Sequence, residues 1–204
     1  MTRIAVVGPI ALTLALGAVG CRGRESSTAL PTPDSTSVAR ARAAATALGA
    51  DLMGMLTRQL AQGGPRAALA VCADSAQART RQHQAEDVYV RRVGTRVRNP
   101  LNTPDSVEAA VLTAFAAALD AGRVPADTLF VAPTGTGSAE LRYLRPIRVQ
   151  EPCLACHGPT AQLAPEVRTL LATRYPADQA VNYAVGDLRG AISVRVPLPP
   201  ARTP

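Results

Sequence analysis

The chain has 204 residues and a formal net charge of +7 at pH 7, and all of its basic residues are arginines. Its hydrophobic content of 47% can build the core of one domain, but aromatic residues make up only 3% and Trp is absent, so Ala, Leu and Val must fill that core. The arginines are spread along the chain and no nucleic-acid-binding motif is present, so we expect no nucleic-acid partner.

Residues 1–20 have the pattern of an export signal. Arg3 precedes an apolar run that glycine and proline interrupt, so the run is too short and too broken to predict a membrane-spanning helix. It ends in small residues before Cys21, as in bacterial lipoprotein signals, whose cysteine is lipidated and becomes the mature N-terminus. An ordinary cleaved secretory signal is the alternative. Both interpretations export the protein to the periplasm or cell envelope, and a lipidated Cys21 would anchor it to a membrane.

Two helices are predicted after a flexible tether. Residues 21–36 are rich in Ser, Thr and Pro and have little apolar surface to bury. Over residues 37–62, Leu and Met recur at three- and four-residue spacing, which predicts a long helix. A Gly-Gly-Pro sequence at 63–65 ends this helix and starts a second one that runs to about residue 82.

The rest of the chain mixes strands and helices. The patterns predict a strand over 86–95, a helix from an N-cap at Thr103 to Ala121, strands over 128–132 and 141–149, a short helix over 165–175 and a last strand over 190–197. The buried stripe of the helix after Thr103 is predicted at Val107, Val111, Ala114, Phe115, Ala118 and Leu119. This irregular order indicates one α+β domain on an antiparallel sheet over residues 37–198, with 199–204 as a disordered tail.

The motif with the clearest chemistry is Cys153-Leu154-Ala155-Cys156-His157. The pattern C-x-x-C-H is typical of covalent attachment of one c-type haem. Two thiols add to the two porphyrin vinyl groups, and the imidazole that follows becomes the proximal iron ligand. Chance and half of a zinc site are the alternatives. Zinc would need a second Cys/His pair at suitable spacing, and the chain has none.

A second axial ligand must come from upstream, because no Met, His or Cys follows His157. The candidates are Met53, Met55, Cys72 and His83. Cys72 lies on one apolar helix face with Leu69 and Ala76, and it is either a ligand or a small buried hydrophobic residue. His83 lies in a polar stretch typical of a helix end at the surface. The two methionines lie among leucines, so we expect them in the core.

Two groups of arginines precede the haem motif. Guanidinium groups pair bidentately with carboxylates, and the two haem propionates are carboxylates. We predict Arg98 and Arg145 as their partners, whereas a solvated strand face is the alternative. The groups are Arg91, Arg92, Arg96 and Arg98, and Arg142, Arg145 and Arg148.

Several stretches together resemble one known family. They are Ala67 to Cys72 after a Gly-Pro, Arg98 to Asp105, Tyr143 to Ile147 before the haem motif, and Val185 to Ser193 after Tyr175-Pro176. Over roughly residues 40–198 the chain resembles a c-type haem family of unknown function whose haem domain has a PAS-like fold. The resemblance implies about five antiparallel strands flanked by helices, with a long N-terminal helix. It also implies one covalent haem c and axial ligation by His157 and Cys72.

Three functions are compatible with these features. The first, which we favour, is an exported mono-haem c protein in redox sensing or electron transfer, with an unidentified redox partner protein. The second is a gas sensor, in which a labile distal ligand gives way to NO or CO. The third is a peroxidase, which needs an open distal site with an acid–base residue, usually His. Only His83 is available and a filled sixth position would block it, so we expect no enzymatic activity.

Overall fold

The computed structural model describes residues 30–135 and 138–199. The predicted export signal 1–20, the lipidation site Cys21, most of the predicted tether 21–36 and nearly all of the predicted tail 199–204 lie outside these residues. No helix in the described part of the chain is both long enough and apolar enough to cross a bilayer.

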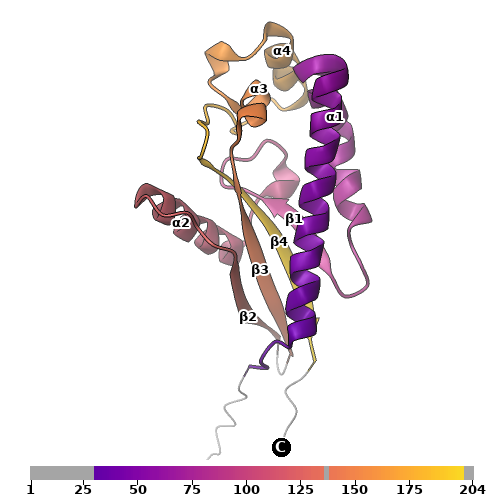
Figure 1. Cartoon of the computed structure of the whole chain (residues 1–204), viewed down its shortest axis with the longest axis vertical. Coiled ribbons are helices and arrows are strands. Elements are labelled where there is room, and N and C mark those ends of the chain that lie inside the picture. The colour runs from indigo at the N-terminus through magenta and orange to yellow at the C-terminus, as the bar shows by residue number, and fades with distance from the viewer. Residues whose placement is uncertain (1–29, 136–137, 200–204) are drawn as a thin grey trace, which may run out of the picture.

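The long N-terminal element α1 (Ser35–Gln82) is a hairpin of two helices. Asp34 caps its start by accepting a hydrogen bond from the backbone N–H of Ser37. At Gly64 the backbone takes φ +67° and ψ −170°, which a side chain would disfavour, and the chain reverses there. The segments on either side of Gly64, residues 35–63 and 65–82, then lie side by side (Figure 1). The predicted break between two helices is confirmed.

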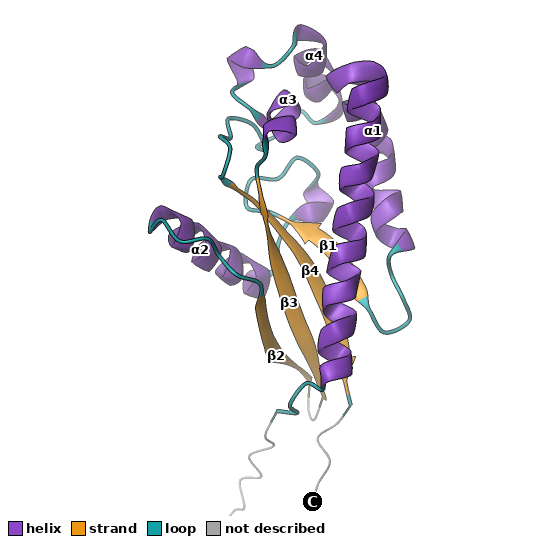
Figure 2. Cartoon of the chain, viewed as in Figure 1, coloured by secondary structure: helices purple, strands orange, loops and turns teal. Residues whose placement is uncertain are grey.

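Four antiparallel strands form the sheet, in the order β1-β4-β3-β2. They are β1 (Tyr89–Val93), β2 (Thr128–Gly135), β3 (Ser138–Arg148) and β4 (Leu188–Leu198). The predicted α+β class, with a long N-terminal helix and an antiparallel sheet flanked by helices, is confirmed (Figure 2). The sheet within the described residues has four strands, whereas about five were expected.

Alternation along the strands gives the sheet two different faces. One face packs against the first segment of α1 and forms the main core, which includes Leu48, Val90, Tyr143 and Val194. The other face packs against α2 (Ser106–Asp120) around Leu112, Phe115, Val93, Leu144 and Ala191. Neighbouring residues of one strand therefore point to opposite faces of the sheet, and this alternation decides which way each arginine of β1 points.

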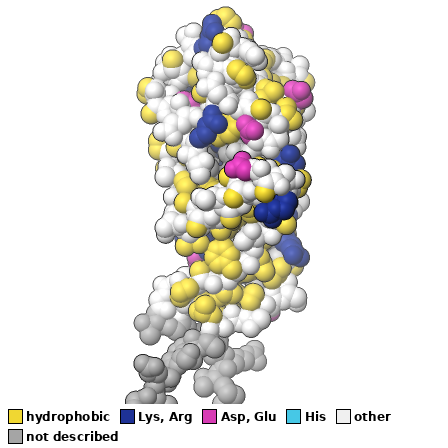
Figure 3. Space-filling view, turned by 90° about the vertical axis from the view of Figure 1, so that its left-hand side faces the viewer, with side chains coloured by type: hydrophobic (Ala, Val, Ile, Leu, Met, Phe, Trp, Pro, Cys, Tyr) yellow, Lys and Arg dark blue, Asp and Glu magenta, His cyan; other side chains and the backbone are white. Residues whose placement is uncertain are grey.

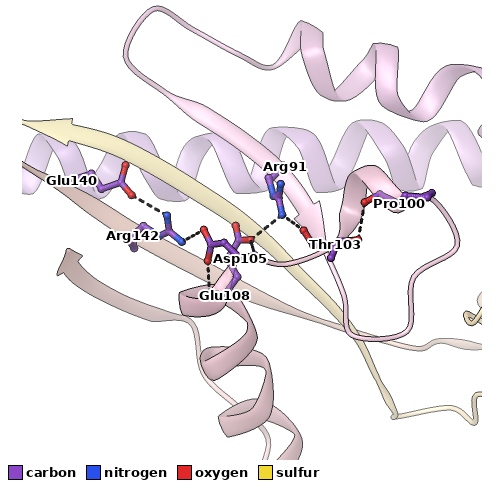
Figure 4. Close-up of polar contacts among 7 residues, drawn as sticks. All are labelled: Arg91, Pro100, Thr103, Asp105, Glu108, Glu140 and Arg142. Carbon is purple, nitrogen blue, oxygen red and sulfur yellow. Dashed lines mark hydrogen bonds and ion pairs between the residues drawn. The ribbon is translucent and has the colours of Figure 1, made fainter. Parts of the chain in front are cut away.

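Helix α2 starts two residues later than predicted, because Asp105 rather than Thr103 is its N-cap. Asp105 accepts from the backbone N–H of Glu108 at 2.7 Å, and the Glu108 carboxylate accepts from the backbone N–H of Asp105 at 2.9 Å, which closes a capping box. The carboxylate of Glu108 also pairs with Arg91 of β1 at 2.9 Å (Figure 4). This pair turns Glu108 into the core, so the predicted stripe is only partly confirmed: Phe115 is buried and Val111 packs against the same core. Leu112 is buried, while Val107 and Ala114 are exposed.

Short helical pieces cap the end of the molecule at which α1 reverses (Figure 1). They are the 3-10 turn Glu151–Cys153, α3 (Leu154–His157), the 3-10 turn Thr160–Gln162 and α4 (Pro165–Arg174). A small core at this end joins Leu69 of α1 to Leu163, Val167 and Leu171, with Cys156 packed against it. The C-x-x-C-H motif is thereby held against the second segment of α1.

On the face drawn in Figure 3, arginine side chains are scattered and do not form a continuous basic stripe.

Candidate functional site

A cavity of about 300 Å³ lies between the two segments of α1, strand β1 and the C-x-x-C-H motif. Its volume is within the range of small-molecule and cofactor sites. Apolar side chains from α1 form much of the wall, together with both motif cysteines and three arginines. The residues that matter to its chemistry are Leu52, Met53, Met55, Leu69, Cys72, Ala76, Arg92, Arg98, Asn102, Cys153, Cys156, His157 and Arg189.

The imidazole of His157 is oriented by one backbone carbonyl. Its Nδ1 lies 2.6 Å from the carbonyl oxygen of Ala180. A carbonyl can only accept, so Nδ1 carries the proton and Nε2 keeps its free lone pair for a metal. Burial lowers the pKa of His157 well below its ordinary value, and the charges of Arg189 and Arg98 lower it further. The neutral imidazole is the form that binds iron.

Arg98 holds the motif to the loop that supplies this carbonyl. Its Nε donates to Asp178 at 2.9 Å, and its Nη2 donates to the carbonyls of Cys156 at 2.6 Å and Ala180 at 3.2 Å. The Arg98 and Asp178 side chains are only 10% and 9% exposed. Arg98 lines the cavity as the sequence suggested, but most of its donors are used within the protein. Its main role in this structure is therefore to hold the motif in place.

Cys72 faces the same cavity as His157 from the second segment of α1. It is a partly buried free thiol, as are Cys153 and Cys156. Burial raises the pKa of the Cys72 thiol, although the nearby charge of Arg92 opposes this. The reversal at Gly64 brings Cys72 to this position.

The other upstream candidates are placed differently. His83 lies with its Nε2 3.1 Å from Asp51 and is not part of the cavity wall. Met53 and Met55 both line the main cavity; Met55 is buried as expected, but Met53 is exposed and does not lie in the core. A smaller adjoining cavity of about 100 Å³ is lined by Cys72 and His157 but by neither methionine. Cys72 is thus the candidate that accompanies His157 in both cavities.

Arg145 lies outside the walls of both cavities, contrary to its predicted role as a propionate partner. Its guanidinium donates to Thr46 and to the Tyr143 hydroxyl, both at 2.8 Å, and lies 3.4 Å from Asp127. Arg145 shares the α1 face of β3 with Tyr143, and these partners keep it beside the first segment of α1. The structure therefore corrects this assignment.

Arg92 and Arg189 are cavity residues that the sequence did not single out. Strand β1 alternates, so Arg91 points to α2 while Arg92 points to the cavity. Arg189 is the second residue of β4, beside Gly190, and its Nη1 donates to the carbonyl of Arg96 at 3.3 Å. The period-two pattern of β1 was the signal that could have separated Arg92 from its neighbours.

The donor set fits a c-type haem. Two free thiols, a neutral imidazole with Nε2 available, a facing thiol and an apolar wall are the groups that such a cofactor needs. A tetrahedral zinc site needs four converging ligands. Over residues 30–135 and 138–199, no three His, Cys, Asp or Glu side chains come together as a metal-binding group.

The chain was compared with known proteins. It is similar in structure to the cyanobacterial heme-protein Tll0287, with a TM-score of 0.62 and 22% sequence identity over 83% of this chain and 100% of that one. At this identity the likeness shows the fold alone. No protein with a curated description matches. The Tll0287-like family model matches residues 27–197, which is most of the sequence. The chain therefore belongs to the Tll0287-like family.

Proposed function

We propose that this protein is an exported mono-haem c protein that acts in redox sensing or electron transfer. Cys153 and Cys156 hold the haem covalently, His157 is the proximal ligand and Cys72 is the distal ligand. When bound, haem c supplies a one-electron iron couple. The structural relative is described as a heme-protein, which agrees with the proposal.

One observation carries the proposal: Cys72 on the second segment of α1 and His157 at the end of α3 line both cavities, and the two motif thiols line the main one. The proton on Nδ1 of His157 is held by Ala180, so the ring presents Nε2 to the cavity. Cysteine as an axial ligand lowers the reduction potential relative to Met, because a thiolate stabilises ferric iron. A filled distal position suits electron transfer or redox sensing and leaves no open site for peroxide, so the proposal includes no enzymatic activity.

The location is part of the same proposal. Attachment of c-type haem in bacteria takes place outside the cytoplasmic membrane, which agrees with the export pattern of residues 1–20. We assign lipidation to Cys21, so that the domain is tethered to a membrane and meets its redox partner protein there. Cys21→Ser should release the protein into the soluble fraction, and a variant that stays membrane-bound after a high-salt wash would contradict the anchor.

Covalent attachment is tested with Cys153→Ala/Cys156→Ala. The protein should lose its haem stain on a denaturing gel, because no thioether bond can form. The control is Cys72→Ala, which removes a thiol from the same cavity but leaves both attachment points. The control should keep the stain. Haem staining of the double variant at the level of the unaltered protein would contradict the proposal.

The distal ligand is tested by optical and electron paramagnetic resonance spectra of Cys72→Ala. The ferric protein should be six-coordinate and low-spin with a thiolate signature, and the variant should become high-spin or take a substitute ligand. Ala70→Ser, a change on the same helix at a residue that lines neither cavity, is the matched control and should leave the spectrum unaltered. An unchanged ferric spectrum in Cys72→Ala would move the assignment to Met53 or Met55.

A further inference from the structure

The cavity contains more positive charge than the protein neutralises. Arg92, Arg98 and Arg189 line both the main and the smaller cavity, and neither wall contains an Asp or Glu. Arg98 is neutralised by Asp178 just outside the wall. Arg92 and Arg189 form no ion pair with any described residue, so two guanidinium charges remain without a carboxylate.

Arg92 is the more exceptional of the two. Its side chain makes no hydrogen bond to any described residue, and its Nε is fully buried without a partner. Burial lowers the pKa of Arg92, as does the charge of Arg189 nearby. Burial is also the main cause that lowers the pKa of Arg189, whose guanidinium lies 5.6 Å from the centre of the Tyr183 ring. Two desolvated cations close enough to repel each other are costly unless anions lie beside them.

The arginines line both cavities, and the two cavities differ in which other residues line them. Cys153 and Cys156, like Leu52 and Met53, line the main cavity and not the smaller one. The smaller cavity lacks both cysteines and adds polar groups, namely Gln77, Asn99 and Tyr175. The vinyl groups that meet the thiols and the two propionates occupy different edges of a haem. The two attachment thiols therefore lie in the cavity with the larger apolar wall, and the smaller cavity, which they do not line, has a larger share of polar and cationic side chains.

We propose that Arg92 and Arg189 bind the two haem propionates in the smaller cavity, in place of Arg98 and Arg145. This inference rests on the proposed function, since it needs a haem whose vinyl edge is fixed by Cys153 and Cys156. Two carboxylates supply the two charges that the protein lacks, and each can accept a charge-assisted hydrogen bond from a guanidinium.

The backbone makes room for this arrangement. Gly94, two residues after Arg92, lies so close to Arg189 that a Cβ on it would be 2.9 Å from the Arg189 carbonyl oxygen and 3.2 Å from Arg189 Nη1. A side chain at position 94 would therefore push the Arg189 guanidinium from its place. The two arginines come from adjacent strands that pair directly, so their separation is set by β1–β4 hydrogen bonding.

The test uses the haem-loaded protein and compares Arg92→Gln, Arg189→Gln and the double variant with Arg145→Gln as the matched control. Arg92 has no partner within the protein, so its replacement leaves no protein group unpaired. Two signals are measured: the propionate bending band in resonance Raman spectra, and the pH dependence of the reduction potential. Haem staining on a denaturing gel is recorded for every variant.

In the double variant the Raman band should shift, and the potential should become pH-dependent around neutrality, because the propionates are no longer held ionised. At neutral pH the ferric-to-ferrous ratio should rise at least tenfold, which is 59 mV for a one-electron couple. The reduction potential of Arg92→Lys should depend less on pH than that of Arg92→Gln, because lysine keeps the positive charge but lacks the planar guanidinium. Arg145→Gln should leave both signals unchanged.

Each contrary result has a definite meaning. A changed potential with an unshifted Raman band and no new pH dependence would show that the arginines act only at a distance, which overturns the propionate assignment. A response in Arg145→Gln equal to that of the double variant overturns it as well. Both outcomes leave covalent haem intact, so the proposed function stands. If the unaltered protein carries no covalent haem, both proposals fall together.

Discussion

Buried arginines have carboxylate partners on one face of the sheet and lack them on the other. On the α2 face, Arg91 pairs with Glu108, and Arg142 pairs with Asp105 and Glu140 (Figure 4). On the α1 face, Arg92 and Arg189 line a cavity without any carboxylate partner in the described chain. The first cluster is closed, because each of its guanidinium groups pairs with at least one carboxylate, and it fastens α2 to the strands. The second cluster is open, because its two guanidinium groups have no carboxylate partner among the described residues. A buried charge without a protein partner indicates a site at which a ligand supplies the opposite charge.

Arg91 and Arg92 are adjacent in sequence, so the contrast depends on the pairing of β1 with β4. Gly190 makes that pairing possible, since a Cβ on it would lie 2.0 Å from the Val93 carbonyl oxygen and its φ is +148°. Gly190→Ala should destabilise the protein by about 4 kcal/mol through backbone strain and a clash that neither strand can relieve. Denaturant unfolding followed by circular dichroism measures this.

The control for this substitution is Gly122→Ala. Gly122 also has a positive φ, +70°, but nothing lies within 4 Å of an added Cβ. Its cost should be only the backbone term, about 1–2 kcal/mol. Equal losses in the two variants would show that close approach of β1 and β4 does not matter.

The closed cluster is tested by removing one charge from it. Glu108 is 2% exposed, and Glu108→Gln keeps the side-chain shape but leaves Arg91 without its carboxylate. A buried charge that loses its partner is destabilising, and we expect about 3 kcal/mol here. Glu86→Gln, the same change at an exposed residue, should cost less than about 0.5 kcal/mol. A small loss for Glu108→Gln would mean that water reaches Arg91.

A third test removes the charge of Asp178, the carboxylate that pairs with Arg98 beside the cavity. Asp178→Asn leaves Arg98 without a carboxylate partner. Arg98 keeps its two carbonyl acceptors, so the loss should be smaller, about 2 kcal/mol. The cavity also gains a third free positive charge, which favours ferrous iron and should raise the reduction potential of the haem-loaded protein. Asp120→Asn at the exposed end of α2 is the control. A potential that falls would contradict this account.

The smallest expected effect concerns pH. Burial raises the pKa of Asp105, but the hydrogen bond from Glu108 N–H and the ion pair with Arg142 lower it by more, so the pKa lies below its ordinary value of 3.8. This stabilisation is complete at pH values above 3.8 and is lost as pH falls through the lower pKa of the folded state. Asp105→Asn should be slightly less stable than the unaltered protein at pH 7.

The difference between the Asp105→Asn variant and the unaltered protein should narrow as pH falls below 3.8. Denaturant unfolding at several pH values measures both. A difference that is the same at pH 7 and at acid pH would show that the Arg142 pair contributes through shape and not through charge.

Local patterns in the sequence predicted much of this molecule. The C-x-x-C-H motif and the Gly-Gly-Pro break depend on neighbouring residues only, so their chemistry and geometry are readable without a fold. The N-cap of α2 was misplaced because Thr103 and Asp105 are both good caps, and the choice was made by Glu108 and its distant partner Arg91. That pair joins two elements, and no local pattern reports it.

The sequence placed Arg98 at the cavity but misplaced Arg145 and passed over Arg92 and Arg189, for a related reason. Arg145 was chosen from the arginines that cluster before the haem motif, but whether a strand residue meets a cavity depends on which face its register selects. Arg92 lies between two residues of the opposite face, and Arg189 reaches the cavity only because Gly94 leaves space. Which face a strand residue occupies, and how much space lies beside it, are set by strand pairing and cannot be read from the local sequence.

The carbonyl of Ala180 is shared by His157 Nδ1 and Arg98 Nη2, and the loop around it is tied to the motif again through Tyr183 N–H to the His157 carbonyl at 2.9 Å. Imidazole orientation is therefore governed by a surface loop rather than by the motif alone. That loop is exposed at Val185. A continuous set of hydrogen bonds thus connects a loop with an exposed residue to the ring that we propose as the proximal ligand.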